Sequence, residues 1–372
     1  MLRSHLYLAF GAAGLLTLSA VACGDDSGAG TGGSGANNTT AGKQPPARPS
    51  SGGPGDGTTV TFGTSKLYLG IKTRAGVEDP KAWADFGYDL DGQITEQDFS
   101  NHCKPAGNAP PKSVFPDGNQ GIDNSFGKYL LPIIKTAASS LGGGDLEATL
   151  NESITDGSFN IMMELGALGT QANYNPINAQ LFAGKEGTPP DWKLVPEFFS
   201  PPLTPGNTVP NPIQSPVRFA NSYVNNNTWV SGDKGTVQLS LNISGQSFAL
   251  NIRSAVISMD LDGGRTSATN GVIAGVLDTE ELITQVRDVL GPFISCDGSA
   301  VDGILNQLRQ GSDIMKDGTQ NPNATCDGIS IGLGFDATKV NVVGVGELSD
   351  PAENPCEGGG GTGGNGTGGG GG

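Results

Sequence analysis

Glycine limits how much of this chain can pack into a core. The sequence has 372 residues, of which 60 are glycine, and the glycines are concentrated towards the two ends. Residues 24–58 combine Gly, Ser, Thr, Asn, Ala and Pro without hydrophobic periodicity, and residues 357–372 are almost entirely Gly. Such segments cannot bury enough apolar surface to offset the entropy that is lost on ordering. We therefore expect disordered Gly-rich ends on either side of a single body, residues 59–356.

Residues 1–22 have the layout of an export signal. An apolar run at 6–18 follows Arg3, and small residues then lead to Cys23. The run is too short to indicate a membrane-spanning helix. The string SAVAC at 19–23 resembles the lipobox of bacterial lipoproteins, a family in which the cysteine is acylated and becomes the first residue of the mature chain.

The lipobox resemblance implies a membrane partner and a cellular location. It implies that residues 1–22 are removed, that Cys23 carries the lipid, including palmitate, and that residues 23–58 tether the body to the membrane. Gly24 stands where an Asp is the familiar signal for inner-membrane retention, which favours the outer membrane. We expect a protein of the bacterial cell envelope whose body faces the periplasm or the cell exterior. The alternative is an ordinary signal peptide cut at an Ala-rich site beside a chance cysteine.

The acidic balance of the chain excludes one class of partner. The formal net charge is -16 at pH 7. Phosphate backbones are bound by clustered Lys and Arg, so a chain this acidic is not expected to bind nucleic acid.

Alternation of apolar and polar residues predicts antiparallel strands. The clearest pair, 237–243 and 248–252, flanks residues 244–246 and predicts a hairpin with one buried face. Further strands are predicted at 66–72, 158–165, 255–261, 271–277, 330–335 and 339–345.

Helical periodicity appears at 123–141, 278–291 and 299–310, and Asp278 with Glu281 forms a capping box. The predicted fold class is therefore β-rich α+β. We expect an antiparallel sheet, either a sandwich or a curved sheet, with about three packing helices. Residues 171–216 are rich in Pro and Asn and are expected to form a long excursion, at which the body could be subdivided.

Four cysteines follow Cys23, and an even number in an exported chain indicates two disulfides. They are Cys103, Cys296, Cys326 and Cys356. Four cysteines permit three pairings, of which we favour Cys296–Cys326, across the helix at 299–310, and Cys103–Cys356, which joins the start and end of the body. A zinc site is the alternative, but the chain has no C-x-x-C pair and His102 is its only histidine after the signal.

Residues 87–99 resemble the calcium loop of EF-hands and dockerin repeats. Asp89, Asp91 and Asp98 fall at loop positions 3, 5 and 12, although Gly87 occupies position 1, where Asp is normal. Calcium requires several hard oxygen ligands around a tight turn, which this spacing supplies.

A second acidic string, residues 117–124, could complete the same site. The predicted calcium ligands are Asp89, Asp91, Asp98, Asp117, Asn119 and Asp123. The alternative is plain turn chemistry, with Asp123 as a helix N-cap. A third string, 260–263, repeats the DLDG of 89–92, but it lies between strands, where Asp-Gly is typical of a turn.

Motifs of catalysis are missing from the sequence. No H-E-x-x-H or G-x-x-x-x-G-K-[ST] string occurs, and His102 would have to serve any histidine-dependent triad. We therefore name no catalytic residue and favour a protein that is not an enzyme. Two alternatives remain: an extracellular glycoside hydrolase that uses paired carboxylates, and a carrier of lipid or another hydrophobic ligand.

Three aromatic residues in or beside the Pro/Asn-rich excursion are candidates for ligand binding. They are Trp192, Tyr223 and Trp229. Exposed rings can form platforms for sugars or peptides, whereas buried rings would fasten the excursion to the core.

The order of features resembles uncharacterised lipoproteins of myxobacterial type. A lipobox and Gly-rich tether are followed by the DLDG turn, the segment at 117–127 leading into a helix, β-hairpins and late cysteines. This resemblance implies a location and no activity. We expect a membrane-anchored, exported binding or structural module of unknown ligand, stabilised by calcium.

Overall fold

The computed structural model describes residues 42–140, 145–243, 246–294 and 302–349. The predicted signal peptide, the lipidated Cys23 and the poly-Gly tail lie outside these residues, as do Cys296 and Cys356.

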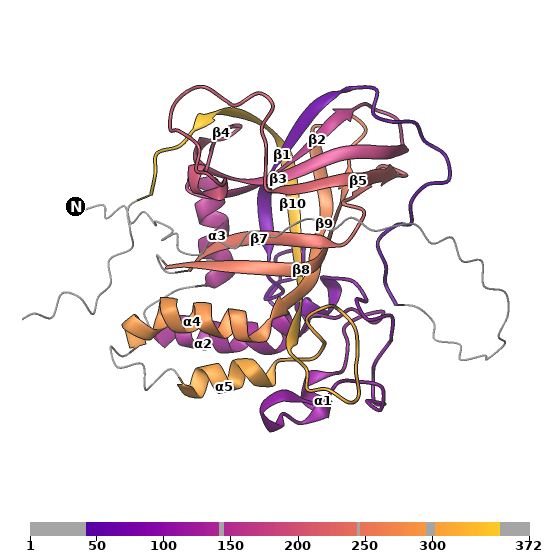
Figure 1. The fold of residues 1–372 in the computed structure, drawn as a ribbon, viewed down its shortest axis with the longest axis vertical. Coiled ribbons are helices and arrows are strands. Elements are labelled where there is room, and N and C mark those ends of the chain that lie inside the picture. The colour runs from indigo at the N-terminus through magenta and orange to yellow at the C-terminus, as the bar shows by residue number, and fades with distance from the viewer. Residues whose placement is uncertain (1–41, 141–144, 244–245, 295–301, 350–372) are drawn as a thin grey trace, which may run out of the picture.

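Eight antiparallel strands close into a barrel, which dominates the molecule (Figure 1). In their order around the barrel they are β1 (Thr58–Tyr68), β2 (Asn160–Leu168), β3 (Tyr174–Thr188), β5 (Val217–Asn225), β6 (Thr228–Val230), β8 (Gln246–Leu261), β9 (Ser267–Asp278) and β10 (Gly328–Val345). The closing pair is β10 with β1, in a register that places Thr61 opposite Val340 and Tyr68 opposite Gly334.

Two further strands attach to the barrel. β4 (Asp191–Leu194) pairs antiparallel with β3 and parallel with β10. β7 (Gly235–Ile243) pairs with β8 along the predicted hairpin, with Val237 opposite Ile252. Strand β8 therefore pairs with β7 along its first part and with β6 along its last part.

The predicted sandwich or curved sheet with about three packing helices is wrong, because the sheet closes on itself. Closure depends on the pairing of β1 with β10, which lie at opposite ends of the body. Alternation along one strand carries no information about such a distant partner. Parts of β9 and β10 are buried on both faces, so alternation is also weak there.

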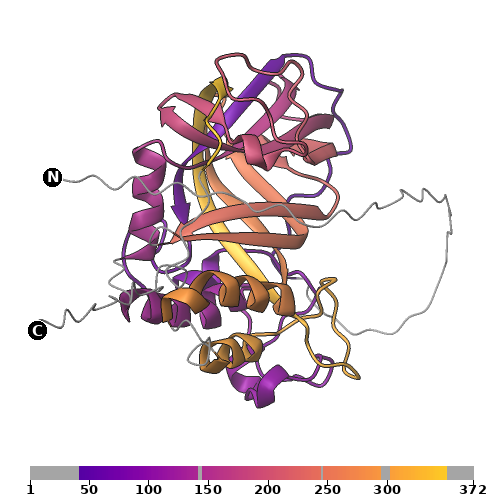
Figure 2. The same ribbon diagram turned by 60° about the vertical axis from the view of Figure 1, so that its left-hand side comes forward.

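Short helices cover one end and one side of the barrel. They are α1 (Pro111–Val114), the π-helical turn η3 (Phe126–Leu130), α2 (Leu131–Ser140), α3 (Leu146–Thr155), α4 (Thr279–Ile294) and α5 (Asp302–Gln310). There are also 3-10 turns at Ala82–Asp85, Ala106–Asn108 and Pro196–Phe198. Figure 2 shows α2, α4 and α5 together below the barrel, with α3 along its side. Within the described residues, no helix is both long and apolar enough to span a bilayer.

The main core fills the space enclosed by the sheet and the helices. All eight barrel strands contribute buried apolar side chains to this one cluster, as do α3, α4 and α5. Residues 171–216 include β3, a barrel strand, so part of the predicted excursion belongs to the barrel wall.

Residues 42–57, which we call the N-terminal strap, run up the outside of the barrel into β1 (Figure 1). Sequence composition had assigned them to the tether. The strap is held by hydrogen bonds from Asn225 Nδ2 to Ala47 O and from Arg48 to Asn175 Oδ1, at 2.8 and 2.7 Å. The side chain of Asp56 accepts a hydrogen bond from Tyr174 at 2.6 Å.

A long segment between β1 and α2 packs against β10 and shapes the end of the molecule that holds the candidate site. Asn124 joins the two, because its amide exchanges hydrogen bonds of 3.0 Å with the N–H and C=O of Gly332. A Cβ at position 332 would lie 2.1 Å from Phe86 O, so only glycine permits this approach.

Candidate metal centre

Three predicted calcium ligands meet at one point in this segment. Asp89, Asp91 and Asp123 each offer a carboxylate oxygen, and these oxygens all lie within 4.8 Å of one another. Asp89 and Asp123 are buried and Asp91 is half-buried. The structure therefore brings together half of the predicted ligand set.

Backbone N–H groups in and beside the turn at 89–92 hold the carboxylates of Asp89 and Asp91 in place. Gly92 has a φ of +79°, and its N–H donates to Asp89 Oδ1 at 2.6 Å. The N–H of Gln93 donates to Asp91 Oδ1 at 2.8 Å. Asp-x-Asp-Gly thus folds into a tight turn, for which glycine supplies the left-handed backbone.

Asp123 joins this turn from another part of the segment. Its Oδ2 accepts hydrogen bonds from the N–H of Leu90, at 2.6 Å, and of Asp91, at 3.4 Å. The alternative role as a helix N-cap is not observed, because the first helical turn begins at Phe126, after Ser125.

Two more aspartates interact with these three, half-buried Asp117 and buried Asp313, and we call the five together the aspartate cluster. They are Asp89, Asp91, Asp117, Asp123 and Asp313. Asp117 Oδ2 accepts the N–H of Thr95 at 2.6 Å, and Asp313 accepts the N–H and hydroxyl of Ser330 at 2.8 and 2.5 Å.

Burial and mutual repulsion hold protons on the cluster. Burial, with added repulsion from Asp91 and Asp313, raises the pKa of Asp117 to about 8. Burial raises the pKa of Asp313 to about 7 against the hydrogen bonds from Ser330. Burial, followed by repulsion from Asp91 and Asp117, raises the pKa of Asp123 well above its ordinary value.

No salt bridge neutralises the aspartate cluster within the described part of the chain. Lys128 influences Asp117 and Asp313 electrostatically, but its ammonium donates to Val114 O and Pro116 O, at 3.2 and 2.8 Å. Buried carboxylates without such a partner must be neutralised by protons or by a bound cation.

Gln320 connects the cluster to a distant loop. Its Nε2 donates to Asp91 Oδ2 at 2.9 Å, and its Oε1 accepts the N–H of Cys103 at 3.0 Å. Sequence analysis missed both Gln320 and Asp313. Gln320 is 229 residues from Asp91, and no local motif marks either residue.

Two predicted ligands lie apart from the cluster. Asp98 is exposed and accepts the N–H of Ser100, at 3.0 Å, within its own turn. Asn119 is exposed and donates to Asp85 Oδ1 at 2.6 Å.

The third acidic string forms a turn between β8 and β9. Asp262 Oδ1 accepts the N–H groups of Thr266 and Ser267, at 2.6 and 2.7 Å, and its Oδ2 accepts that of Gly264 at 3.0 Å. The same tetrapeptide, DLDG, therefore sits in two settings, one inside the aspartate cluster and one on an exposed turn.

A disulfide joins Cys103 to Cys326, so the predicted partners of both cysteines are wrong. The bond is flanked by backbone hydrogen bonds from Lys104 N to Ala324 O and from Cys326 N to Lys104 O. These contacts bring together chain segments 223 residues apart, which cysteine spacing does not reveal.

The three candidate aromatic residues are buried. Trp192 lies in a side cluster with Phe182 and Leu194, and Trp229 lies in the main core, where its indole donates to Ser222 Oγ at 3.0 Å. Tyr223 lies under the strap and donates to Pro46 O at 2.6 Å. None of these rings presents a face to solvent as a ligand platform would.

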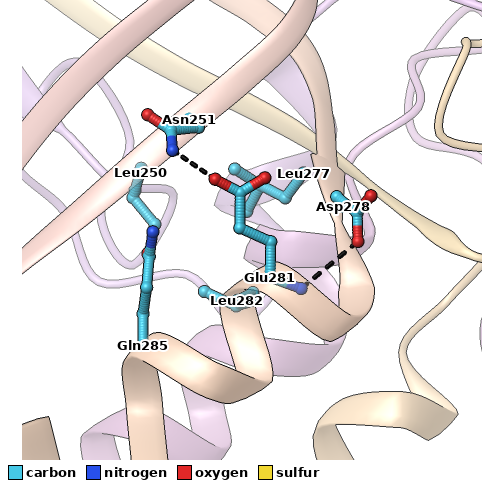
Figure 3. A pocket seen from close by; sticks show the side chains of 7 residues that line it. All are labelled: Leu250, Asn251, Leu277, Asp278, Glu281, Leu282 and Gln285. Atoms are coloured by element: carbon cyan, nitrogen blue, oxygen red, sulfur yellow. Dashed lines mark hydrogen bonds between the residues drawn. The ribbon is translucent and has the colours of Figure 1, made fainter. Parts of the chain in front are cut away.

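The predicted capping box at the start of α4 lies beside a small hollow between β8, β9 and α4 (Figure 3). Asp278 Oδ1 accepts the N–H of Glu281 at 3.2 Å, as expected of a residue that caps a helix. The Glu281 carboxylate instead accepts from the side chain of Asn251 (Figure 3). With a volume of about 10 Å³, the hollow has room for little more than a water molecule.

Comparisons with known proteins found no matching family model, no similar curated protein and no similar solved structure.

Proposed function

We propose that the protein is an exported, lipid-anchored binding or structural module whose aspartate cluster holds a calcium ion. The observation that carries the calcium proposal is the convergence of Asp89, Asp91 and Asp123 within 4.8 Å with no salt-bridge partner among the described residues. Calcium prefers carboxylate, amide and carbonyl oxygens, and it accepts irregular geometry.

The chemistry of the donor set fits a hard divalent cation. The three converging groups are carboxylates, and the described residues near them include one histidine, His102, whose Nε2 is engaged by Thr95 Oγ1 at 2.9 Å. Zinc and copper favour imidazole and thiolate ligands, and Cys103 is already in a disulfide.

The calcium would serve structure, because the cluster joins separate parts of the chain. The strap contributes the N–H of Gly42, which donates to Asp89 Oδ2 at 2.7 Å. Gln320 brings in the loop that carries the disulfide. A cation that neutralises the carboxylates would therefore stabilise the strap, the acidic turns and this loop against one another.

A thermal unfolding experiment on the full mature chain tests the calcium proposal. Millimolar Ca²⁺ should raise the midpoint over that in chelator by about 5 °C, since a ligand that binds only the folded state stabilises it. Asp91→Asn should abolish this rise. The matched control is Asp262→Asn, the same position of the second DLDG string, which should retain it. Equal midpoints with Ca²⁺ and chelator in the wild type would refute the calcium proposal.

The anchoring proposal rests on the lipobox resemblance and is tested separately. Cells grown with an alkyne-tagged palmitate should incorporate the label into this protein and not into its Cys23→Ala variant. Label that persists in the variant, or a wild type that stays unlabelled, would count against the anchor and leave the calcium proposal unaffected.

A further inference from the structure

The outer face of the barrel carries a groove of about 400 Å³ that is remote in sequence from the aspartate cluster. Its lining comes from β2, β3, β5 and the loop before β5, and it includes Glu164, Asn178, Gln180, Gln214, Arg218 and Ala220. Neighbouring strands β2, β3 and β5 lie side by side in Figure 1. The lining shares no residue with the cluster.

Strand register explains why this face is hollow. Glu164, Gln180 and Arg218 are direct cross-strand neighbours and form one row on the outer surface. The next outward positions are Gly166, Asn178 and Ala220, and the pairing of β3 with β5 shifts register beside Asn178. The two small residues leave open space on both sides of Asn178.

The loop that walls the groove is fastened to this first row. Gln180 donates to Ile213 O at 3.1 Å and accepts the N–H of Ser215 at 3.1 Å. Arg218 donates to Ser215 O and to Gln214 Oε1, both at 2.8 Å. The wall is therefore preformed, so a ligand would not have to order it.

Several polar groups of the lining keep free hydrogen-bonding capacity. Glu164 Oε1 accepts from Gln180 at 2.6 Å, and its Oε2 has no hydrogen-bond partner among the described residues. Within the same part of the chain, the amide of Asn178, Nε2 of Gln214 and Nη1 of Arg218 likewise have none. The groove thus offers acceptors and donors together, with one formal charge of each sign.

We infer that this groove binds a neutral carbohydrate of two or three sugar units. Sugar hydroxyls both donate and accept hydrogen bonds, as do the carboxamides of the lining, and the volume lies within the range of small-molecule sites. The opposite charges of Glu164 and Arg218 balance, which gives no preference for a strongly charged ligand.

Two other functions of the groove fit less well. Peptides commonly bind by adding a strand, but β2, β3 and β5 are each paired on both sides. Hydrolysis of a glycosidic bond commonly requires a pair of carboxylates, and Glu164 is the one carboxylate of this lining. The groove therefore suits sugar binding without cleavage.

Saturation-transfer NMR on the full mature chain tests this inference. The probes are cellotetraose, chitotetraose, maltotetraose and mannotetraose, with tetra-alanine as a peptide probe, each in calcium-containing buffer. At least one sugar should bind, with an affinity on the order of 1 mM or tighter. Because Asn178 and Ala220 are exposed, Asn178→Ala and Ala220→Trp should fold normally.

The variants decide where the sugar binds. Asn178→Ala should weaken binding by about tenfold through lost hydrogen bonds, and Ala220→Trp should abolish binding by filling the groove. Asn207→Ala, an exposed asparagine outside the lining, is the matched control and should bind as the wild type does. Binding of none of the sugars, binding of tetra-alanine alone, or sugar binding that is equal in all three variants would overturn the inference.

Discussion

Asp123 sits among like charges in a buried position, so its charge opposes folding when no cation is present. Burial and the nearby Asp91 and Asp117 raise its pKa, while the N–H of Leu90 stabilises one carboxylate oxygen. An asparagine would keep an oxygen for Leu90 and remove the charge. We expect Asp123→Asn to raise the free energy of unfolding in chelator by about 1–3 kcal/mol and to remove the gain given by calcium.

Urea unfolding in Ca²⁺ and in chelator measures both effects of Asp123→Asn. Asp262→Asn is again the control, since Asp262 lies on an exposed turn where hydrogen bonds lower its pKa. This control should lose a little stability and keep the calcium response. A variant Asp123→Asn that is less stable in chelator and still responds to calcium would contradict the proposed electrostatics.

Gly332 lies where the segment between β1 and α2 packs directly against the barrel strand β10. Gly332→Ala would place a Cβ against the backbone oxygen of Phe86, which cannot move aside easily. We expect a loss of more than about 3 kcal/mol in the free energy of unfolding. Gly303→Ala is the control, because nothing lies within 4 Å of its Cβ in α5. The control should leave stability unchanged or raise it by up to about 1 kcal/mol, and equal effects of the two variants would contradict the packing described here.

Local spacing was enough to find part of the candidate site. Asp89 and Asp91 belong to one turn, and Asp123 belongs to a string with similar acidic composition. The spacing of acidic residues around turns therefore predicted all three as calcium ligands. Asp313 and Gln320 approach the cluster only after the chain has closed into its tertiary fold. Asp98 was predicted from its position in a calcium-loop template, but its turn directs it to Ser100 and to solvent.

At the scale of elements, the disulfide couples two loops at the end of the barrel that holds the aspartate cluster. Cys103 and Cys326 close a stretch of 223 residues, which restricts the unfolded chain strongly. We expect the double variant Cys103→Ser/Cys326→Ser to lose about 2–5 kcal/mol of unfolding free energy, measured by urea denaturation. Reduction of the wild type is the control and should cause at least this loss. A non-reducing peptide map that joins Cys103 to Cys356 would contradict the observed pairing.

Strand prediction located 271–277, which lies in β9 and is buried on both faces, but it missed β3 and the continuity of β10. The predicted hairpin is formed by β7 and β8, with Val237 opposite Ile252. β10 is one continuous strand in place of the two predicted at 330–335 and 339–345. β3 lies in the predicted excursion, where Pro and Asn conceal the strand pattern, yet it pairs with both β2 and β5.

For the whole molecule, the buried carboxyl groups predict how stability depends on pH. In the folded state the pKa of Asp117 is raised to about 8 and that of Asp313 to about 7, from an ordinary value of 3.8. Between about pH 4 and pH 8 the unfolded chain therefore binds fewer protons than the folded one, so stability falls as pH rises. In chelator, the free energy of unfolding should drop by on the order of a few kcal/mol across this interval.

Calcium should reduce this pH dependence, because a bound cation replaces the protons that the folded state otherwise holds. Urea denaturation at a series of pH values, with and without Ca²⁺, measures both slopes. Stability in chelator that rises between pH 5 and pH 8 would contradict the assignment of buried, uncompensated carboxyl groups.

The barrel itself could not be predicted from local patterns. Its closing pair, β1 with β10, joins the two ends of the body, and β4 inserts between β3 and β10 at one rim. The strap adds a further contact that composition had concealed, since its few anchoring side chains, such as Arg48, lie among Gly, Ser and Pro. Long-range pairing and isolated anchors leave little trace in hydrophobic periodicity.

The most direct test of the central claim is native mass spectrometry of the full mature chain in about 1 mM Ca²⁺, a concentration at or above the dissociation constants of extracellular calcium modules. We predict one bound calcium per chain in the wild type, lost on treatment with EDTA and missing from Asp91→Asn, while Asp262→Asn retains it. A calcium-free mass in the wild type, or equal calcium content in wild type and Asp91→Asn, would contradict the claim that the aspartate cluster is a calcium site.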